Sequence, residues 1–204
     1  MSPQALLEQN RATGFSESIR LLRALRHLNQ LLPLKYRQAS LPRSLVEVHR
    51  SILRSFAERG RPLTTAEIAA MLGDEASALN ALATLASKDL IVLNSAADKH
   101  PATHRVVISD PAAVEIVGAY PFSTMPTAHV VNLFGHDIFA MCALDGMSMA
   151  PMFGTQTRIT SKCHVTGDTV RVHQKGMQIL EVSPSTAQFG IRWQKGSAIA
   201  AHGL

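Results

Sequence analysis

The spacing of apolar residues changes near residue 110, and this change limits the possible folds more than any other feature of the sequence. Between residues 41 and 110, apolar side chains recur at helical spacing in three consecutive segments. From Pro111 onward, β-branched residues mix with glycine and proline, and apolar and polar residues alternate in several runs. This order predicts an α+β protein in which a helical domain precedes a small, mixed β-rich domain. A chain of 204 residues is long enough for two small domains.

The helical domain has clear signals for the ends of its helices. Ser44–Arg59 has an apolar face with helical spacing and is followed by Gly60, a residue typical of helix C-termini. Thr64 or Thr65 then caps a short second helix. Glu67 stands where a capping box requires an acidic residue.

A third helix and two strands complete the predicted domain. Asp74 caps the helix over residues 75–89, and two β-rich runs follow at residues 90–94 and 104–109. We expect these two runs to pair as a hairpin, with a polar loop through Asp98 and Lys99 between them. Three helices followed by a hairpin predict a winged-helix-like domain over residues 41–110.

The charge pattern argues against sequence-specific DNA binding by this domain. The formal net charge is +5, with most of the excess base in the first half of the chain. A helix that reads DNA needs basic or amide side chains near its N-terminus. The third helix instead begins with Asp74 and Glu75, and Lys88, its only base, lies at the far end. We therefore expect at most weak binding of nucleic acid without sequence preference, through the basic first half of the chain.

Residues 1–40 are predicted to form an N-terminal helical extension and linker, with an amphipathic helix over Phe15–Leu32. The first residues lack the pattern of a signal peptide, and no apolar run is long enough to suggest a membrane span. Two cysteines cannot form a disulfide framework. These features predict a cytoplasmic protein with free thiols and no membrane partner.

Residues 111–204 are predicted to form the β-rich domain. Thr166, Gly167 and Asp168 indicate a hairpin turn, and residues 176–184 and 189–194 are typical of strands. One short helix is expected over Asp145–Phe153, where Asp145 could serve as the N-cap.

Cys142 stands three positions before Asp145 in the run AMCALDG. A nearby carboxylate discourages formation of the thiolate, so the pair suggests a chemistry that uses both groups. On one helical turn, side chains three residues apart share a face.

Three runs, GAYPFS, AMCALDGMSMAPMFG and ITSKCHVTGDTVRV, resemble the organomercurial (alkylmercury) lyases. The resemblance extends over roughly residues 41–204 and is strongest between Gly118 and Val172. It implies a winged-helix-like domain followed by a lyase-like catalytic domain, the order that the apolar pattern also predicts.

The resemblance implies protonolysis of a carbon–mercury bond, giving a hydrocarbon and Hg(II). Cys142 would be the attacking thiolate, since soft Hg(II) prefers thiolate ligands. Asp145 would be the proton shuttle, and both residues could ligate the metal. The expected partners are an organomercurial and external thiols; Hg(II) is a bound product, and no cofactor is expected.

The family's second catalytic cysteine has no counterpart in this sequence. The chain is therefore either truncated at its C-terminus or a divergent member. Cys163 matches a family cysteine with a structural role, and we expect it to be a well-packed buried thiol. A different class of function also stays open: a non-catalytic soft-metal-binding or metal-responsive regulatory protein with a winged-helix domain.

Other potential ligands in this region have simpler interpretations. Methionine at this density usually packs in a core, and the histidines lack the spacing of a metal site. These residues are Met141, Met147, Met149, Met152, His136, His164 and His173.

Overall fold

The computed structural model describes residues 34–100, 103 and 105–188 of the chain. It divides into two compact units, residues 1–40 and residues 41–204. The described part of the first unit contains helix α2 (Leu34–Ala39). The helix predicted over Phe15–Leu32 and the strand predicted over residues 189–194 lie outside the described residues.

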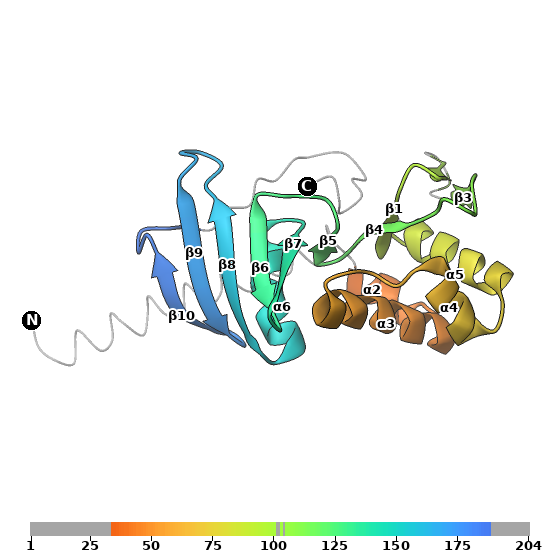
Figure 1. Ribbon diagram of the computed structural model, residues 1–204, viewed down its shortest axis with the longest axis horizontal. Coiled ribbons are helices and arrows are strands. Elements are labelled where there is room, and N and C mark those ends of the chain that lie inside the picture. The colour runs from red at the N-terminus through yellow and green to blue at the C-terminus, as the bar shows by residue number, and fades with distance from the viewer. Residues whose placement is uncertain (1–33, 101–102, 104, 189–204) are drawn as a thin grey trace, which may run out of the picture. The chain divides into compact units, whose positions relative to one another are not determined.

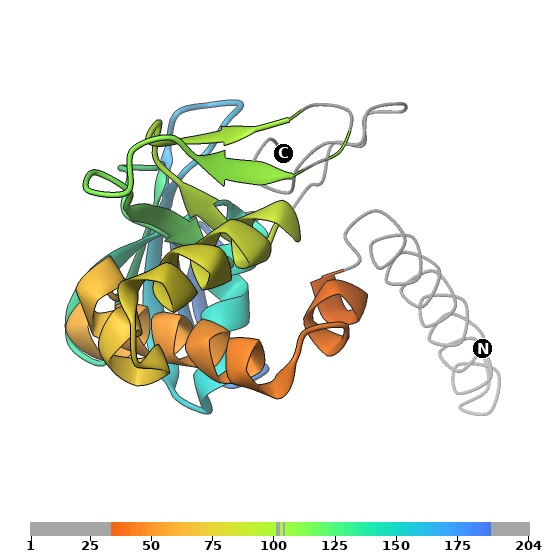
Figure 2. The ribbon, with the colours of Figure 1, turned by 90° about the vertical axis from the view of Figure 1, so that its right-hand side faces the viewer.

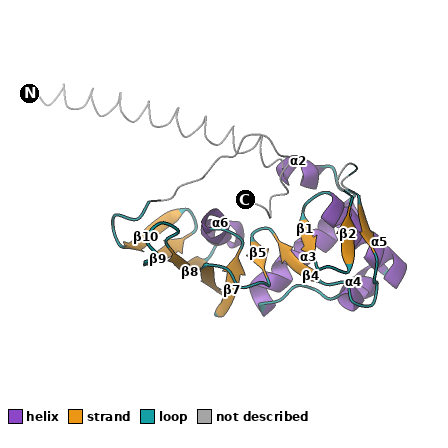
Figure 3. Ribbon diagram, turned by 90° about the horizontal axis from the view of Figure 1, so that it is seen from above, coloured by secondary structure: helices purple, strands orange, loops and turns teal. Residues whose placement is uncertain are grey.

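The three predicted helices of the second unit are present (Figure 3). They are α3 (Arg43–Arg59), α4 (Thr65–Leu72) and α5 (Glu75–Ser87). Helix α3 ends at Gly60, which adopts the left-handed conformation. Asp74 caps α5 by accepting a hydrogen bond from the Ser77 amide. The local signals therefore located the helix ends to within about two residues, the usual uncertainty of such boundaries.

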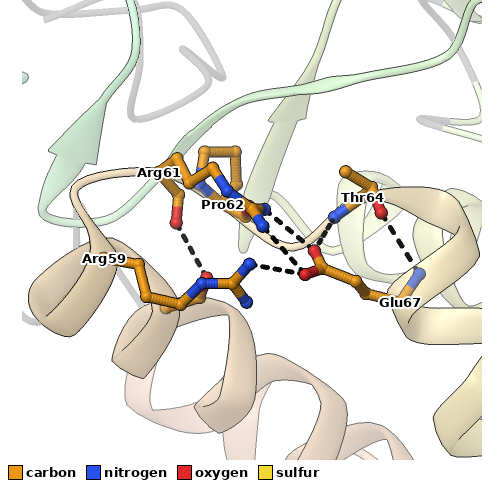
Figure 4. Close-up of polar contacts among 6 residues, drawn as sticks. Arg59, Arg61, Pro62, Thr64 and Glu67 are labelled. Atoms are coloured by element: carbon orange, nitrogen blue, oxygen red, sulfur yellow. Dashed lines mark hydrogen bonds and ion pairs between the residues drawn. The ribbon is translucent and has the colours of Figure 1, made fainter.

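Glu67 connects α3 to the start of α4 (Figure 4). The Thr64 side chain accepts from the Glu67 amide, and the Glu67 carboxylate accepts from the Thr64 amide at 2.8 Å, which confirms the predicted capping box. The same carboxylate pairs with Arg59 at 2.6 Å and with Arg61 at 2.9 Å. The hydrogen bond from Thr64, followed by the one from Arg61, lowers the pKa of Glu67.

The predicted hairpin between residues 90–94 and 104–109 is wrong. Strand β1 (Ile91–Leu93) pairs with β4 (Ile116–Ala119), whereas β3 (Val106–Ile108) pairs with β2 (Ala97–Lys99) (Figure 2). Asp98 and Lys99, expected in a loop, thus lie in a strand. Asn94 helps to set the observed register, because its side chain donates to the Ala113 carbonyl at 2.8 Å. An alternating pattern identifies a strand but does not choose its partner.

Eight strands form one antiparallel sheet in the order β1-β4-β5-β7-β6-β8-β9-β10. The remaining strands are β5 (Phe122–Ser123), β6 (His129–Leu133), β7 (His136–Ala140), β8 (Gln156–Lys162), β9 (Thr169–Lys175) and β10 (Gln178–Ser183). Strands β8 and β9 form the hairpin predicted around Gly167. Because β1 belongs to this sheet, the sheet includes residues on both sides of the predicted domain boundary at 110/111, and that boundary stays a prediction.

Helix α6 (Ala143–Phe153) packs against β6 and β8 (Figure 1). Phe122 of β5 is fully buried and stacks on Phe56 of α3, with ring centroids 5.1 Å apart. On its other side it contacts Phe153 of α6, with centroids 5.9 Å apart. The core of the second unit thus connects α3, the sheet and α6. Among the described residues, no helix has the length and apolar character needed to cross a membrane.

We predict that Glu67→Ala lowers the free energy of unfolding by about 1 kcal/mol, as expected for loss of a helix cap. Because the pKa of Glu67 is lowered in the folded protein, its contribution is present above the unfolded-state pKa. That contribution is lost as the pH falls through the lowered pKa. Urea denaturation at several pH values measures both effects.

Glu47→Ala is the matched control. Glu47 pairs with Arg43 at 3.3 Å on the exposed side of α3, and such surface pairs contribute little. Equal destabilisation by the two substitutions would show that the capping box is not the source of the Glu67 effect.

Candidate active site

Cys142 lies between β7 and α6 and is the N-cap of the helix. Its backbone is extended, with φ −147° and ψ 177°, and its Sγ accepts a hydrogen bond from the Asp145 amide at 3.4 Å. The helix predicted near Asp145–Phe153 is present and begins two residues earlier, at Ala143, whereas the suggestion that Asp145 is its N-cap is wrong. Asp145 is the third helical residue and not the cap. A cysteine is an unusual cap, so capping preferences did not locate this helix start.

The two side chains predicted to act together are in contact. The Cys142 thiol and the Asp145 carboxylate share a hydrogen bond, and both side chains are half-buried. Burial, followed by the charge of Asp145, raises the pKa of Cys142 to about 12. Burial also raises the pKa of Asp145, although the hydrogen bonds from Cys142 partly oppose this shift. The thiol therefore holds its proton at neutral pH and donates it toward the carboxylate.

This arrangement prepares the pair for proton transfer. An electrophilic soft metal that binds sulfur displaces the thiol proton, and Asp145 is the hydrogen-bonded acceptor. Because burial makes the Asp145 carboxylate more basic than usual, it can take that proton and later release it.

Gly146 allows the first turn of α6 to lie close to the sheet. A Cβ atom at this position would stand 3.4 Å from Val131 and 3.6 Å from Ala140 and Ile159. Gly146 is buried, and its neighbours in the chain are Asp145 and Met147. The turn that contains Asp145 is thereby held against β6, β7 and β8.

The two cysteines lie at the same edge of the sheet, which the sequence did not reveal. Strands β7 and β8 are both antiparallel to β6, so they run in the same direction and their carboxyl ends share an edge. Cys142 follows β7 by two residues, and Cys163 follows β8 by one. With β6 between them, the two strand ends are separated by about 10 Å, or two strand spacings.

Cys163 is not the well-packed buried thiol that we expected. It is half-exposed in the turn between β8 and β9. Hydrogen bonds to the Thr166 side chain and then to the backbone of Thr166 and Val165 lower its pKa. At neutral pH, Cys163 is therefore the more readily ionised of the two thiols.

Among the histidines, His129 was missed by sequence reasoning. Its Nδ1 lies 2.9 Å from the Ser161 hydroxyl across β6 and β8, and burial lowers its pKa. His136 is exposed, and His173 contacts Gln156 at 3.3 Å. Within the described residues, no group of three or more His, Cys, Asp or Glu side chains could hold a metal ion.

The methionines near the site differ in burial. Met149 is fully buried and Met152 is 47% exposed, while Met141 and Met147 are half-buried. A groove of about 730 Å³ lies elsewhere, between α4 and residues 111–116, and neither cysteine lines it.

The fold and the site define a cysteine-based centre with an adjacent acid on an α+β scaffold. Residues 122–203 match the family model of MerB, the alkylmercury lyases. The alkylmercury lyase of Staphylococcus epidermidis is 36% identical over 76 residues, which are 37% of this chain and 35% of that protein. The enzyme of Streptomyces lividans is 35% identical over 66 residues, 32% of this chain and 31% of that protein. Residues 122–203 are thus similar in sequence to the alkylmercury lyase family.

The fold is shared with a solved structure. The crystal structure of the mercury-bound form of MerB2 superimposes with a TM-score of 0.57 and 23% identity, over 78% of this chain and 68% of that chain. In contrast, the sequence matches span about a third of the length of the curated relatives.

We predict that iodoacetamide labels Cys163 before Cys142 at pH 8. The thiolate is the reactive form, and the pKa of Cys163 is lowered whereas that of Cys142 is raised to about 12. Mass spectrometry of the digested protein after timed labelling distinguishes the two sites. Faster labelling of Cys142 would contradict the described burial and hydrogen bonding of that thiol.

Proposed function

We propose that this protein is an organomercurial lyase that cleaves a carbon–mercury bond with Cys142 and Asp145. One observation supports this function above all others: a half-buried thiol and a half-buried carboxyl group lie on the first turn of one helix, and the thiol sulfur accepts a hydrogen bond from the Asp145 amide at 3.4 Å. The family match over residues 122–203 supports an organomercurial substrate. Its curated relatives are alkylmercury lyases.

The first step is capture of mercury by sulfur. An organomercurial with an exchangeable ligand approaches Cys142, a sulfur–mercury bond forms, and the exchangeable ligand leaves with its electron pair. The thiol proton passes to Asp145, which becomes a neutral carboxylic acid. Soft mercury favours sulfur strongly enough to displace this proton, even from a thiol whose pKa is about 12.

The second step is protonolysis. Asp145 gives its proton to the carbon, the electron pair of the carbon–mercury bond stays with that carbon, and a hydrocarbon leaves. Mercury remains as Hg(II) on the Cys142 thiolate, and the Asp145 carboxylate can provide a second ligand. Hg(II) is thus product and cargo, and we propose no further cofactor.

A further soft ligand to mercury is proposed to come from an external thiol. A second thiolate increases the electron density at carbon and later carries Hg(II) away. Low-molecular-weight thiols are abundant in the reducing cytoplasm, and this is where we expect the protein to act. Cys163 lies at the same sheet edge as Cys142, but the separation of the strand ends makes it a poor direct partner.

For helices α3–α5 and the β2–β3 hairpin we propose a winged-helix-like scaffold that supports the lyase part. Helix α5 begins with Asp74 and Glu75, and hydrogen bonds from Ser77 lower the pKa of Asp74. Two acidic side chains at the start of α5 repel phosphates, so we do not expect this helix to recognise DNA bases. The alternative of a metal-responsive regulator is therefore not favoured.

Asp145→Asn tests the proposed function. The amide keeps nearly the same shape but cannot relay a proton, so we predict that hydrocarbon release falls by about 10²–10⁴-fold, the usual contribution of a positioned acid. Gas chromatography of the headspace measures release, in the presence of excess external thiol. Mass spectrometry should find the intact organomercurial bound to Cys142 in this variant.

Cys142→Ser and Cys163→Ser provide matched comparisons. The first should abolish both capture and release, and the second should retain release within about threefold, because it alters a half-exposed turn residue. A wild-type protein that releases no hydrocarbon with thiol present would overturn the proposed function. If Asp145→Asn releases hydrocarbon at the wild-type rate, the proton comes from another group.

A further inference from the structure

Helix α6 contains a proline at a position where the helix needs an amide hydrogen. Pro151 lies inside the helix, and a proline has no N–H group to donate to the carbonyl four residues earlier. That carbonyl belongs to Met147, two residues after Asp145. A helix carbonyl without a donor in a packed region is costly, so a substitute donor is expected.

Gln174 of β9 supplies that donor. Its side-chain Nε2 donates to the Met147 carbonyl at 2.9 Å and to the Gly176 carbonyl at 2.7 Å. The residue is only 3% exposed. Because both partners are acceptors, they require the NH₂ group at this place, which fixes the orientation of the amide.

The contact lies next to the proposed site. Gly146 packs on β6, β7 and β8, and the following residue, Met147, is held to β9 by Gln174. Two consecutive residues of α6 thus attach it to four strands. Asp145 directly precedes them, and Cys142 caps the same turn.

We propose that Gln174 is a positioning residue for the Cys142–Asp145 pair, because it replaces the hydrogen bond that Pro151 removes from α6 and fixes this helix on the sheet. Its effect on catalysis rests on the proposed lyase function. Its effect on the environment of Cys142 does not depend on that function and can be measured separately.

Thr157 provides a matched control. It stands directly opposite Gln174 in the β8–β9 pairing and is 1% exposed. Among the described residues, its hydroxyl has no hydrogen-bond partner. Thr157→Val keeps the shape of this buried side chain and leaves the contact between Gln174 and Met147 intact.

The test measures iodoacetamide labelling of Cys142 between pH 7 and 10, with Cys163→Ser as the parent protein. Gln174→Leu should loosen the start of α6 and admit water to Cys142. We expect labelling at pH 8 to rise about tenfold, because the loosened helix start exposes the thiol to water and reagent. Thr157→Val should label within about twofold of the parent, since ordinary substitutions away from such contacts have small effects.

The double variant Gln174→Leu/Pro151→Ala decides the mechanism. Replacing the proline with alanine restores an N–H group that can donate to Met147, so labelling should return to within about twofold of the parent. Labelling of Gln174→Leu at the parent rate, or no recovery in the double variant, would overturn the proposal. If Gln174→Leu fails to fold, the proposal is supported when the double variant both folds and labels like the parent. Failure of both variants to fold contradicts the proposal.

Hydrocarbon release separates this proposal from the proposed function. If the wild type releases hydrocarbon, Gln174→Leu should reduce the rate and Pro151→Ala should restore it in the double variant. If the wild type releases none, the lyase proposal fails, while the labelling series still tests the role of Gln174.

Discussion

The packing of Phe122 between Phe56 and Phe153 connects the main parts of the second unit. Phe122 lies in β5, Phe56 comes from α3, and Phe153 is the last residue of α6. Aromatic rings in contact contribute beyond the apolar area that they bury. This contact places the end of α6 against the sheet and α3. The start of the same helix is held by Gly146 and Gln174. The site residues therefore depend on a helix that is fixed at both ends.

Burial of the pair is what gives Cys142 and Asp145 their chemistry. In water the pKa of the thiol would be well below 12, and the carboxylate would be a weaker base than it is in this site. Burial penalises both charged forms, so the thiol keeps its proton at neutral pH. A resting thiol of this kind resists ordinary alkylation and oxidation, because both reactions require the thiolate. Cys163 lies in the turn between β8 and β9, where its pKa is lowered, and it lacks this protection from alkylation and oxidation.

The sequence predicted features that depend on neighbouring residues along the chain. The Thr64–Glu67 capping box, the Asp74 cap and the hairpin turn at Gly167 each depend on a few adjacent side chains, and each was found. The contact between Cys142 and Asp145 was found for the same reason.

Features that depend on distant residues were not predictable in this way. The partner of β1 depends on the whole sheet, and the expected hairpin was therefore wrong. The placement of Cys163 and Cys142 at the same edge of the sheet depends on strand directions, and the donation from Gln174 to Met147 joins residues 27 positions apart. Asp145 is not the N-cap of α6, as had been considered, because Cys142 takes that position.

The most direct measurement of the central claim is infrared difference spectroscopy of the thiol and carboxyl groups during mercury capture. An organomercurial is added at neutral pH without external thiol, so that capture precedes any later exchange. Before addition, an S–H band that is absent from Cys142→Ser should be visible. On addition this band should disappear while the C=O band of a protonated carboxylic acid appears in the wild type and not in Asp145→Asn. Loss of the S–H band with no carboxylic acid band in the wild type would show that the thiol proton does not pass to Asp145.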